Sequence, residues 1–277
     1  MITHPNCKIN IGLYVTSKRL DGYHNIETVF VPIPLCDDLE ICIADEFQFI
    51  QDGIPIGGSP MNNLCVKAYN LLHQDFPNQM PPVSIHLTKV IPFGAGLGGG
   101  SSDAAFTLMM LNELCSLKLS IDQLEHYARR LGADCAFFIR NKPMFAYERG
   151  DVFSSIELNM TSYRIVLLKP SCGVSTSEAY RGLTPKPSMI DLCHVLQQPI
   201  KYWKNNVTND FEISIFPLYP QIAELKDMLY RCGALYASMS GSGSSVFGLF
   251  PKDVAISLES IPSDTLSYIL PIINNII

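Results

Sequence analysis

Residues 92–105 read PFGAGLGGGSSDAA, and this stretch is the most informative part of the chain. Its glycines allow positive φ angles and let a ligand approach the backbone closely. Ser101 and Ser102 are good N-cap residues, and they begin a pattern that predicts a helix over 101–117. The preceding run, 83–91, reads as a strand. Because the N-terminus of a helix attracts anions, the order strand, glycine loop, helix predicts a phosphate-binding site.

Three other interpretations of this loop were weighed. A merely flexible turn would not need five glycines, since each costs roughly 1 kcal/mol in ordered structure. Gly94, Gly96 and Gly99 satisfy GxGxxG, but Glu113, at the spacing of the ribose-binding acid, lies inside the predicted helix. The P-loop pattern fails because glycine and serine stand where lysine and its hydroxyl partner belong. Phosphate binding is therefore favoured, with an NAD-dependent oxidoreductase as a less favoured alternative.

Composition excludes several classes of protein. The 277 residues carry a formal net charge of −6, which gives no electrostatic footprint for nucleic acid or an anionic membrane. The nine cysteines form no CxxC pair and the six histidines no HExxH motif, so no protein metal site is expected. The N-terminal sequence lacks a secretory signal pattern, and reduced thiols in the cytoplasm are the simplest expectation.

Working outward from the loop, strands and helices mix without a regular βαβ repeat. Residues 7–15 alternate as a strand with Lys8, Asn10 and Gly12 on one face. A turn at 21–22 leads to a second strand over 25–34, and a helix over 121–131 begins with a capping box and stops at Gly132. A further helix near 222–232 precedes a strand, turn and strand over 236–250. The class predicted is α+β in two lobes.

Four motifs in order resemble the GHMP kinases, a family that phosphorylates small molecules. They are KINIGLY at 8–14 with DGYH at 21–24, the glycine loop, LGAD at 131–134, and MSGSGSSVF at 239–247. The longer glycine run and DGYH are similar to the branch that phosphorylates the 2-hydroxyl of a methylerythritol unit linked to cytidine diphosphate, in non-mevalonate isoprenoid synthesis. The resemblance implies a ribosomal-protein-S5-domain-2-like lobe over 1–152, a ferredoxin-like lobe over 153–277, and an active site between them. Which lobe the last strand joins is left open.

The resemblance also implies catalytic roles for Lys8 and Asp134. Asp134 follows a helix-ending glycine, so it projects from a loop, and it would accept the proton of the substrate hydroxyl. Lys8 would steady Asp134 and the charge near the γ-phosphate. Without the resemblance, a helix-end aspartate and a solvated edge lysine are the ordinary interpretations. Asn10 faces the same side as Lys8 and would orient the acceptor or the aspartate.

Binding residues follow from the same resemblance. The ATP contacts are expected from Pro92, Gly94, Gly96, Leu97, Gly98, Gly99, Gly100, Ser101, Ser102, Asn63 and Lys89. The substrate contacts are expected from Asn10, Tyr23, His24, Asp134, Thr176, Tyr180, Gly241 and Gly243. Tyr23 and Tyr180 would sandwich the cytosine and His24 would bind its edge. The ordinary alternatives are a helix cap for Asn63, a surface charge for Lys89 and a packed ring for Tyr180.

The cofactors expected are ATP and Mg²⁺, the ion being held by serine hydroxyls, water and the nucleotide rather than by a firm protein ligand. The partner expected is a small-molecule substrate, with no nucleic acid and no membrane, for a monomer or homodimer. Three rival functions remain at this point. They are a sister kinase for homoserine, mevalonate or a sugar, the NAD-dependent oxidoreductase, and a catalytically silent nucleotide-binding module.

Overall fold

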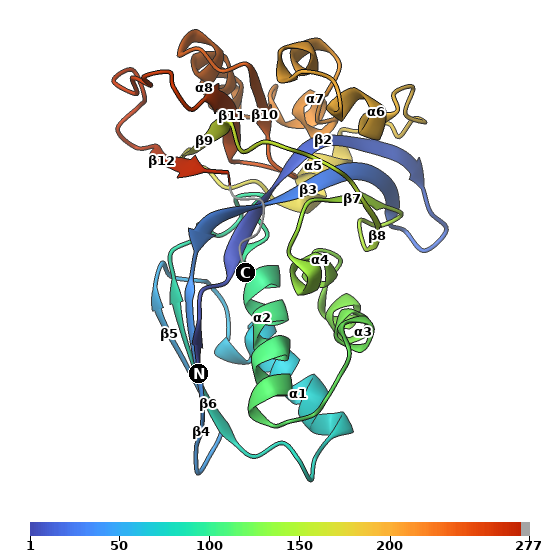
Figure 1. Ribbon diagram of the computed structural model, residues 1–277, viewed down its shortest axis with the longest axis vertical. Coiled ribbons are helices and arrows are strands. Elements are labelled where there is room, and N and C mark those ends of the chain that lie inside the picture. Colours follow the sequence, from blue (N-terminus) through green and yellow to red (C-terminus); the bar gives the residue numbers. More distant parts are fainter. Residues whose placement is uncertain (273–277) are drawn as a thin grey trace. The chain divides into compact units, whose positions relative to one another are not determined.

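The computed structural model describes residues 1–272 and packs as two compact units (Figure 1). Unit 1 comprises residues 1–7, 35–93 and 98–141, and unit 2 comprises residues 8–34, 94–97 and the described residues from 142 on. The units interleave along the chain because strands and the glycine loop contribute to both. The predicted lobe boundary after residue 152 stays a prediction.

Unit 1 is a sheet with helices packed on it. The strand order is β1 (Ile2–Thr3), β4 (Asp38–Ile43), β6 (Val83–Lys89), β5 (Gln48–Gly53), with β5 parallel to β6 and the other pairs antiparallel. The helices are η1 (Pro60–Asn62), α1 (Leu64–Asp75), α2 (Gly99–Leu114), α3 (Ile121–Leu131) and α4 (Cys135–Arg140). Alternate residues of β6, among them Val83, Ile85 and Leu87, are fully buried, as a strand with one core face requires.

Helix α2 begins two residues before the predicted Ser101. Gly98 is its N-cap with a φ of 70°, and the Gly98 carbonyl accepts the first helical bond from Ser102 N at 2.9 Å. A left-handed N-cap suits glycine, which has no Cβ to clash. The helix also ends earlier than predicted, at Leu114, because Ser116 and Lys118 adopt positive φ angles of 52° and 58°.

Helix α3 begins and ends where its capping residues predict. Ser120 and Gln123 form the predicted capping box, and Gly132 N closes the helix on Ala128 O at 3.1 Å. After α2 the chain continues through α3 and α4 instead of returning in a strand parallel to β6. The βαβ unit that a dinucleotide-binding fold requires is therefore absent from this part of residues 1–272.

Unit 2 contains two four-stranded sheets. The first has the order β2 (Asn6–Lys18), β3 (His24–Cys36), β7 (Met144–Tyr147), β8 (Val152–Ser155). The second, antiparallel sheet has the order β10 (Tyr236–Met239), β11 (Val246–Pro251), β9 (Tyr163–Lys169), β12 (Leu266–Pro271). The helices are α5 (Thr176–Arg181), α6 (Leu192–Leu196), η2 (Ile200–Asn205), α7 (Phe211–Ile215) and α8 (Pro220–Arg231).

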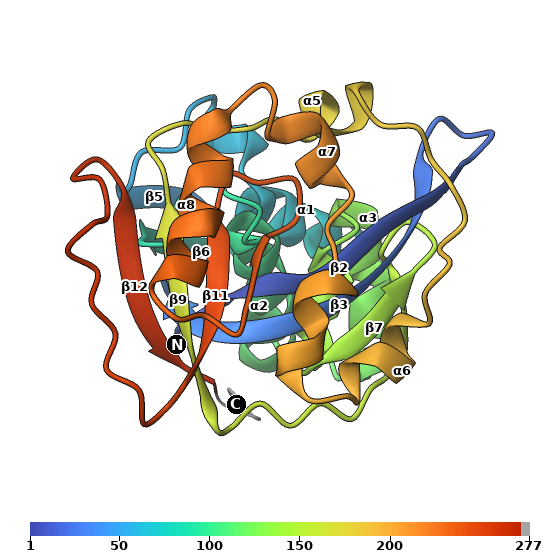
Figure 2. The same ribbon diagram turned by 90° about the horizontal axis from the view of Figure 1, so that it is seen from above.

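Helix α8 covers one face of the second sheet, as Figure 2 shows. Its predicted apolar stripe, which includes Ile222, Leu225 and Leu229, packs into one buried cluster with Val166 of β9 and Phe250 of β11. The strand, turn and strand predicted over 236–250 are β10 and β11. Sheet and helix thus bury a shared apolar layer, which is what stabilises this half of unit 2.

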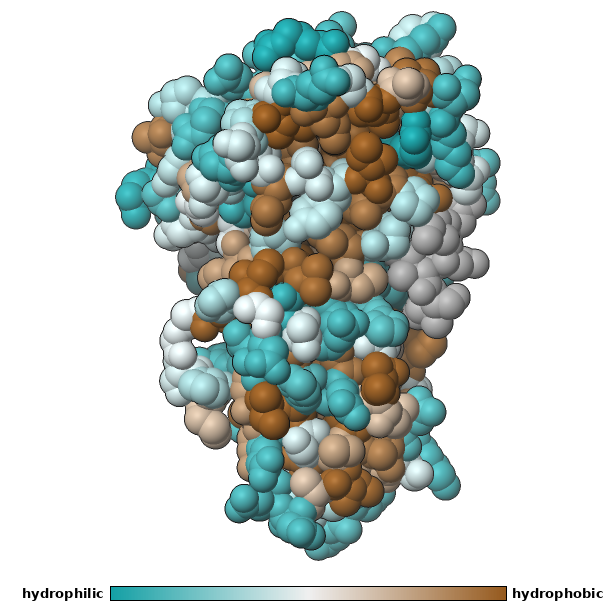
Figure 3. Space-filling model, turned by 90° about the vertical axis from the view of Figure 1, so that its left-hand side faces the viewer, coloured by the Kyte–Doolittle hydropathy of each residue, from teal (hydrophilic) through white to brown (hydrophobic). Residues whose placement is uncertain are grey.

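The last strand pairs with the second sheet of unit 2. Leu266 lies opposite Lys169 and Pro271 opposite Arg164 in an antiparallel register between β12 and β9. Leu266 and Ile269 of β12 are 48% and 46% exposed, and hydrophobic side chains gather in the upper part of the face in Figure 3. Within residues 1–272 no helix has both the length and the apolar character of a membrane span.

Candidate functional site

The first turn of α2, in unit 1, has the donors and the open space that an anion site requires. The N–H groups of Gly99, Gly100 and Ser101 precede the first helical bond, so they are the donors that a helix start leaves for other acceptors. A Cβ built on Gly100 meets nothing within 4 Å, so space is open there. Ser102 Oγ is buried and has no hydrogen-bond partner among the described residues. Open space, free donors and an orphan hydroxyl together suit a phosphate, and the hydroxyl suits a hard cation such as Mg²⁺.

Asp134 lies beside this helix start. It is the N-cap residue of α4 without a capping bond from its side chain, and it follows Gly132 as predicted. The next residue, Cys135, is fully buried; burial raises the pKa of its thiol to about 12, a hydrogen bond with Ser101 lowers it, and the charge of Asp134 raises it. The hydrogen bond between Cys135 and Ser101 joins the start of α4, where Asp134 is the N-cap, to the first turn of α2 within unit 1.

Lys89 is not the surface charge of the ordinary interpretation. It is 3% exposed, and its ammonium contacts the Asp37 carboxylate closely and Asp103 Oδ2 at 2.7 Å. The other Asp37 oxygen accepts from the N–H groups of Val90 and Ile91 at 2.6 and 2.8 Å. The bonds to Asp37 and Asp103 use two of the three N–H donors of the Lys89 ammonium and fix its position, and the predicted adenosine contact stays a prediction.

Asn63 is the helix cap of its ordinary interpretation. Its side-chain oxygen caps α1 by accepting from Cys65 N at 2.9 Å. The amide nitrogen of the same side chain is then the group able to contact a nucleotide, and that contact stays a prediction.

In unit 2, Lys8 and Asn10 share one buried polar face of β2. Lys8 is 3% exposed and donates to Asn10 Oδ1 at 2.6 Å and to the Gly96 carbonyl at 3.1 Å. Asn10 donates to Thr28 Oγ1 at 3.0 Å. The alternating polar face was predicted, but a solvated edge lysine is excluded, because both faces of this part of β2 are buried. Lys8 belongs to unit 2 and Asp134 to unit 1, so their pairing stays a prediction.

Residues 94–97 of the glycine loop pack against the second glycine motif. Ser240 Oγ donates to Gly96 O at 2.9 Å and Ser245 N donates to Ala95 O at 3.2 Å. Gly96 has a φ of +72°, and a Cβ there would lie 1.9 Å from Ser240 O. Gly241, with a φ of +54°, would place a Cβ 3.1 Å from Gly96 O. These glycines are required by close backbone packing within unit 2.

The remaining predicted residues of the glycine loop and of the second glycine motif differ in burial and in backbone conformation. Pro92 is buried in unit 1, and Leu97, 1% exposed, accepts from Lys8 N at 3.0 Å through its carbonyl. Gly94 has a φ of +63° with nothing within 4 Å of its Cβ position. Gly243 has a φ of +88°, and its Cβ would lie 2.7 Å from Met239 Sδ.

Several of the predicted substrate residues of unit 2 make side-chain contacts. His24 stacks on Tyr180 with a centroid separation of 4.5 Å, and Thr176 Oγ1 lies 3.4 Å from Ser242 Oγ. No base fits between His24 and Tyr180, because each stacking contact needs about 3.5 Å. The sandwich predicted from Tyr23 and Tyr180 stays a prediction. Tyr23 is 59% exposed and has the Arg149 guanidinium 5.4 Å from its ring. Burial, and then the charge of Lys18, lowers the pKa of His24, so its ring offers one donor and one acceptor.

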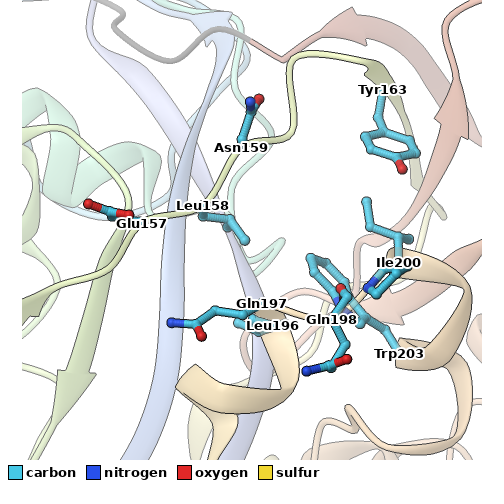
Figure 4. Close-up of a pocket in the computed structure, with 10 residues that line it drawn as sticks. Glu157, Leu158, Asn159, Tyr163, Leu196, Gln197, Gln198, Ile200 and Trp203 are labelled. Carbon is cyan, nitrogen blue, oxygen red and sulfur yellow. The ribbon is translucent and has the colours of Figure 1, made fainter.

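A cavity elsewhere in unit 2 contains none of the predicted site residues (Figure 4). Its volume is about 690 Å³. It is lined by Glu157, Leu158, Asn159, Tyr163, Leu196, Gln197, Gln198, Pro199, Ile200 and Trp203. Trp203 Nε1 is already bonded to Gln198 O at 3.0 Å, and the cavity adds nothing to the site above.

Sequence reasoning missed several polar residues that support the site. Asp103 follows the two serines directly, and an acid in the otherwise apolar stretch of α2 was a usable signal. Asp37 and the segment 209–212 carry no local signal, because their partners lie far along the chain. Among residues 1–272, no group of three or more histidine, cysteine, aspartate or glutamate side chains could hold a metal ion.

Comparisons with known proteins agree with this geometry. The pattern of the GHMP kinases N terminal domain matches residues 63–142, and that of the GHMP kinases C terminal matches residues 194–263. A protein of Azobacteroides pseudotrichonymphae, named 4-diphosphocytidyl-2-C-methyl-D-erythritol kinase, is 54% identical over 256 residues, covering 91% of this chain and 94% of that one. A protein of the same name from Bacteroides fragilis is 54% identical over 261 residues, with 93% and 94% covered.

A solved structure of 4-(cytidine 5'-diphospho)-2C-methyl-D-erythritol kinase has a TM-score of 0.77 at 32% identity, covering 90% of each chain. The N-terminal match includes the glycine loop and Asp134, and the C-terminal match includes the second glycine motif. The chain belongs to the GHMP kinase family, and within it to the 4-diphosphocytidyl-2-C-methyl-D-erythritol kinases.

Proposed function

We propose that this kinase transfers the γ-phosphate of ATP to the 2-hydroxyl of 4-diphosphocytidyl-2-C-methyl-D-erythritol, a step of non-mevalonate isoprenoid synthesis. The observation that carries the substrate is the 54% identity, over 94% of its length, to a relative of that name. The helix start beside Asp134 supports the reaction class, because phosphoryl transfer needs anion binding and a proton acceptor more than covalent chemistry.

The first turn of α2 would bind the triphosphate through the N–H groups of Gly99, Gly100 and Ser101. Asp134 would accept the proton of the attacking hydroxyl, as its place beside that turn favours. Mg²⁺ bound to the nucleotide would neutralise phosphate charge, and Ser102 Oγ is the hydroxyl that fits it. No carboxylate cluster is needed for an ion held mainly by phosphate and water.

Unit 2 would supply substrate contacts and a fixed cation. Lys8 is held by Asn10 and the Gly96 carbonyl, so its ammonium has one orientation and can offset charge on the transferred group. Thr176 and the motif around Gly241 and Gly243 would bind the substrate's diphosphate. His24 would read the cytosine edge, and the base would stack on an outer face of the His24–Tyr180 pair.

A substrate panel tests this proposal. The purified chain with Mg²⁺ and ATP should phosphorylate the cytidine-linked substrate, and turnover of mevalonate, homoserine or galactose instead would refute the choice. Asp134→Asn should lower kcat by about 10²–10⁴-fold while ATP affinity stays within a few-fold of wild type. A variant with full activity would contradict the role of Asp134. We further propose a cytoplasmic location, where ATP is available and scattered cysteines stay reduced.

A further inference from the structure

The segment Asn209-Asp210-Phe211-Glu212 forms a buried polar bracket in unit 2 that the reaction above does not use. Asn209 is 2% exposed, Asp210 8%, and the Glu212 side chain 11%. Buried polar groups are costly unless bonded, so the partners of these side chains indicate what the segment holds in place.

The Asn209 carboxamide holds the second glycine motif. Its Nδ2 donates to the carbonyls of Met239 and Gly241, both at 2.8 Å, which uses both N–H bonds of the group. Its Oδ1 accepts from Phe211 N at 3.0 Å, which fixes the orientation of the amide. The side chain is therefore fully engaged and can occupy one rotamer only.

The bond to Gly241 O also determines where the next N–H points. In a trans peptide the C=O and the following N–H point in opposite directions. Holding Gly241 O toward Asn209 therefore turns Ser242 N–H to the opposite side. The Ser242 hydroxyl lies 3.4 Å from Thr176 Oγ1, so the motif and Thr176 are neighbours. An N–H donor aimed by a rigid group is what a phosphate oxygen needs.

The two acidic residues of the bracket, Asp210 and Glu212, attach it to its surroundings. Asp210 Oδ2 accepts from Val15 N at 2.8 Å, and Asp210 N donates to Leu13 O at 2.8 Å, which ties it to β2, the strand of Lys8. Glu212 Oε1 accepts from Met239 N at 2.9 Å. One short segment thus connects the strand that carries the cation with the start of the glycine motif.

We propose that Asn209 is a positioning residue that aims Ser242 N–H at a phosphate oxygen of the substrate's diphosphate. The inference rests on the proposed function, since it assigns Asn209 to the binding of that substrate rather than of ATP. Removing the donors of Asn209 should therefore weaken diphosphate binding selectively.

Asn209→Asp tests the assignment with little change in volume. The acceptor for Phe211 N is kept, while a carboxylate oxygen replaces the donor and faces two carbonyls. The KM for the cytidine-linked substrate should rise about tenfold or more at pH 8.5, with the KM for ATP within about twofold of wild type. At pH 6 the introduced carboxyl can carry a proton and donate to one carbonyl, so the KM should recover in part.

Asn206→Asp is the matched control, because Asn206 Nδ2 donates to Tyr202 O at 2.7 Å at an exposed position three residues away. It should change neither KM. Asn209→Ala, which removes the donors without adding repulsion, carries the test if Asn209→Asp fails to fold. The inference alone is overturned if the wild type turns over the substrate and the Asn209 variants either keep the wild-type KM for that substrate or raise the KM for the substrate and for ATP equally. A wild type without turnover overturns the proposed function.

Discussion

Replacing Lys89 by methionine should destabilise the protein strongly and in a pH-dependent way. Lys89 is 3% exposed, and its partners Asp37 and Asp103 are 0% and 1% exposed. Removing one partner of a buried ion pair costs about 3–5 kcal/mol, because the remaining charge is left in a medium of low dielectric. Two carboxylates lose their cation here, so we expect the free energy of unfolding to fall by about 5 kcal/mol at pH 8.5.

The pH dependence follows from Asp103. Burial, which outweighs the opposing attraction of Lys89, raises its pKa to about 8, and the charge of Asp37 adds to this. Its Oδ1 is buried without a hydrogen-bond partner among the described residues, which disfavours the charged form. In the unfolded chain the same carboxyl titrates near about pH 4.

Proton uptake by Asp103 therefore stabilises the fold fully below about pH 4, and this stabilisation is lost as the pH rises through about 8. The free energy of unfolding of the wild type should fall in that window by up to about 1.4 kcal/mol per pH unit.

Urea unfolding followed by far-UV circular dichroism at pH 6 and 8.5 measures both effects. Trp203, the single tryptophan, lies in unit 2, so its fluorescence gives a second probe that is remote from the cluster in sequence. Asp103→Asn should show a flatter pH dependence of the free energy of unfolding than the wild type, and combining it with Lys89→Met should restore part of the loss. A Lys89→Met variant that loses less than about 1 kcal/mol, or loses equally at both pH values, would refute the reasoning.

Two glycine substitutions in the phosphate loop should have opposite effects on stability. Gly100→Ala should raise the free energy of unfolding by about 0.5–1 kcal/mol, because a Cβ meets nothing within 4 Å and alanine favours the helix. The same change should raise the KM for ATP several-fold, and steady-state kinetics showing an unchanged KM would contradict a phosphate at that place. Gly96→Ala should lower the free energy of unfolding by about 3 kcal/mol or more, because its Cβ would lie 1.9 Å from Ser240 O at a φ of +72°. An unaltered melting temperature would show that the two backbones do not approach so closely.

Features with local causes were the ones that the sequence predicted well. The capping box of α3 and its end at Gly132 depend on residues within one turn, and the structure has both. The strand β2 was predicted from alternation, because side chains on a strand point to opposite faces. The start of α2 was misplaced by two residues, since serine is the commoner N-cap and only the left-handed φ of Gly98 decides against it.

Features that depend on distant partners were missed. The surface charge that was the ordinary alternative for Lys89 is wrong, and the sequence carries no local sign of this because its partner Asp37 is 52 residues away. Asn209 had no pattern of its own, and its bond to Gly241 spans 32 residues. The burial of Lys8 likewise depends on what covers the second face of β2, which alternation along one strand cannot report. The family and the local elements were therefore predictable from the sequence, while the distant contacts that hold the candidate site residues in place were not.

Glycine is needed within residues 94–100 for two separate physical reasons, and the distinction bears on where the nucleotide binds. No larger residue can replace Gly96 without a clash, because Ser240 O occupies the place of a Cβ. Gly100 lies in a helical turn with no neighbour at its Cβ position, where alanine would be more stable. The stability of the fold therefore does not explain a glycine at position 100. A residue without a side chain beside free N–H groups is an advantage only when a ligand approaches the backbone there. Of the glycines in this loop, Gly100 is consequently the one whose replacement separates binding of ATP from stability of the fold.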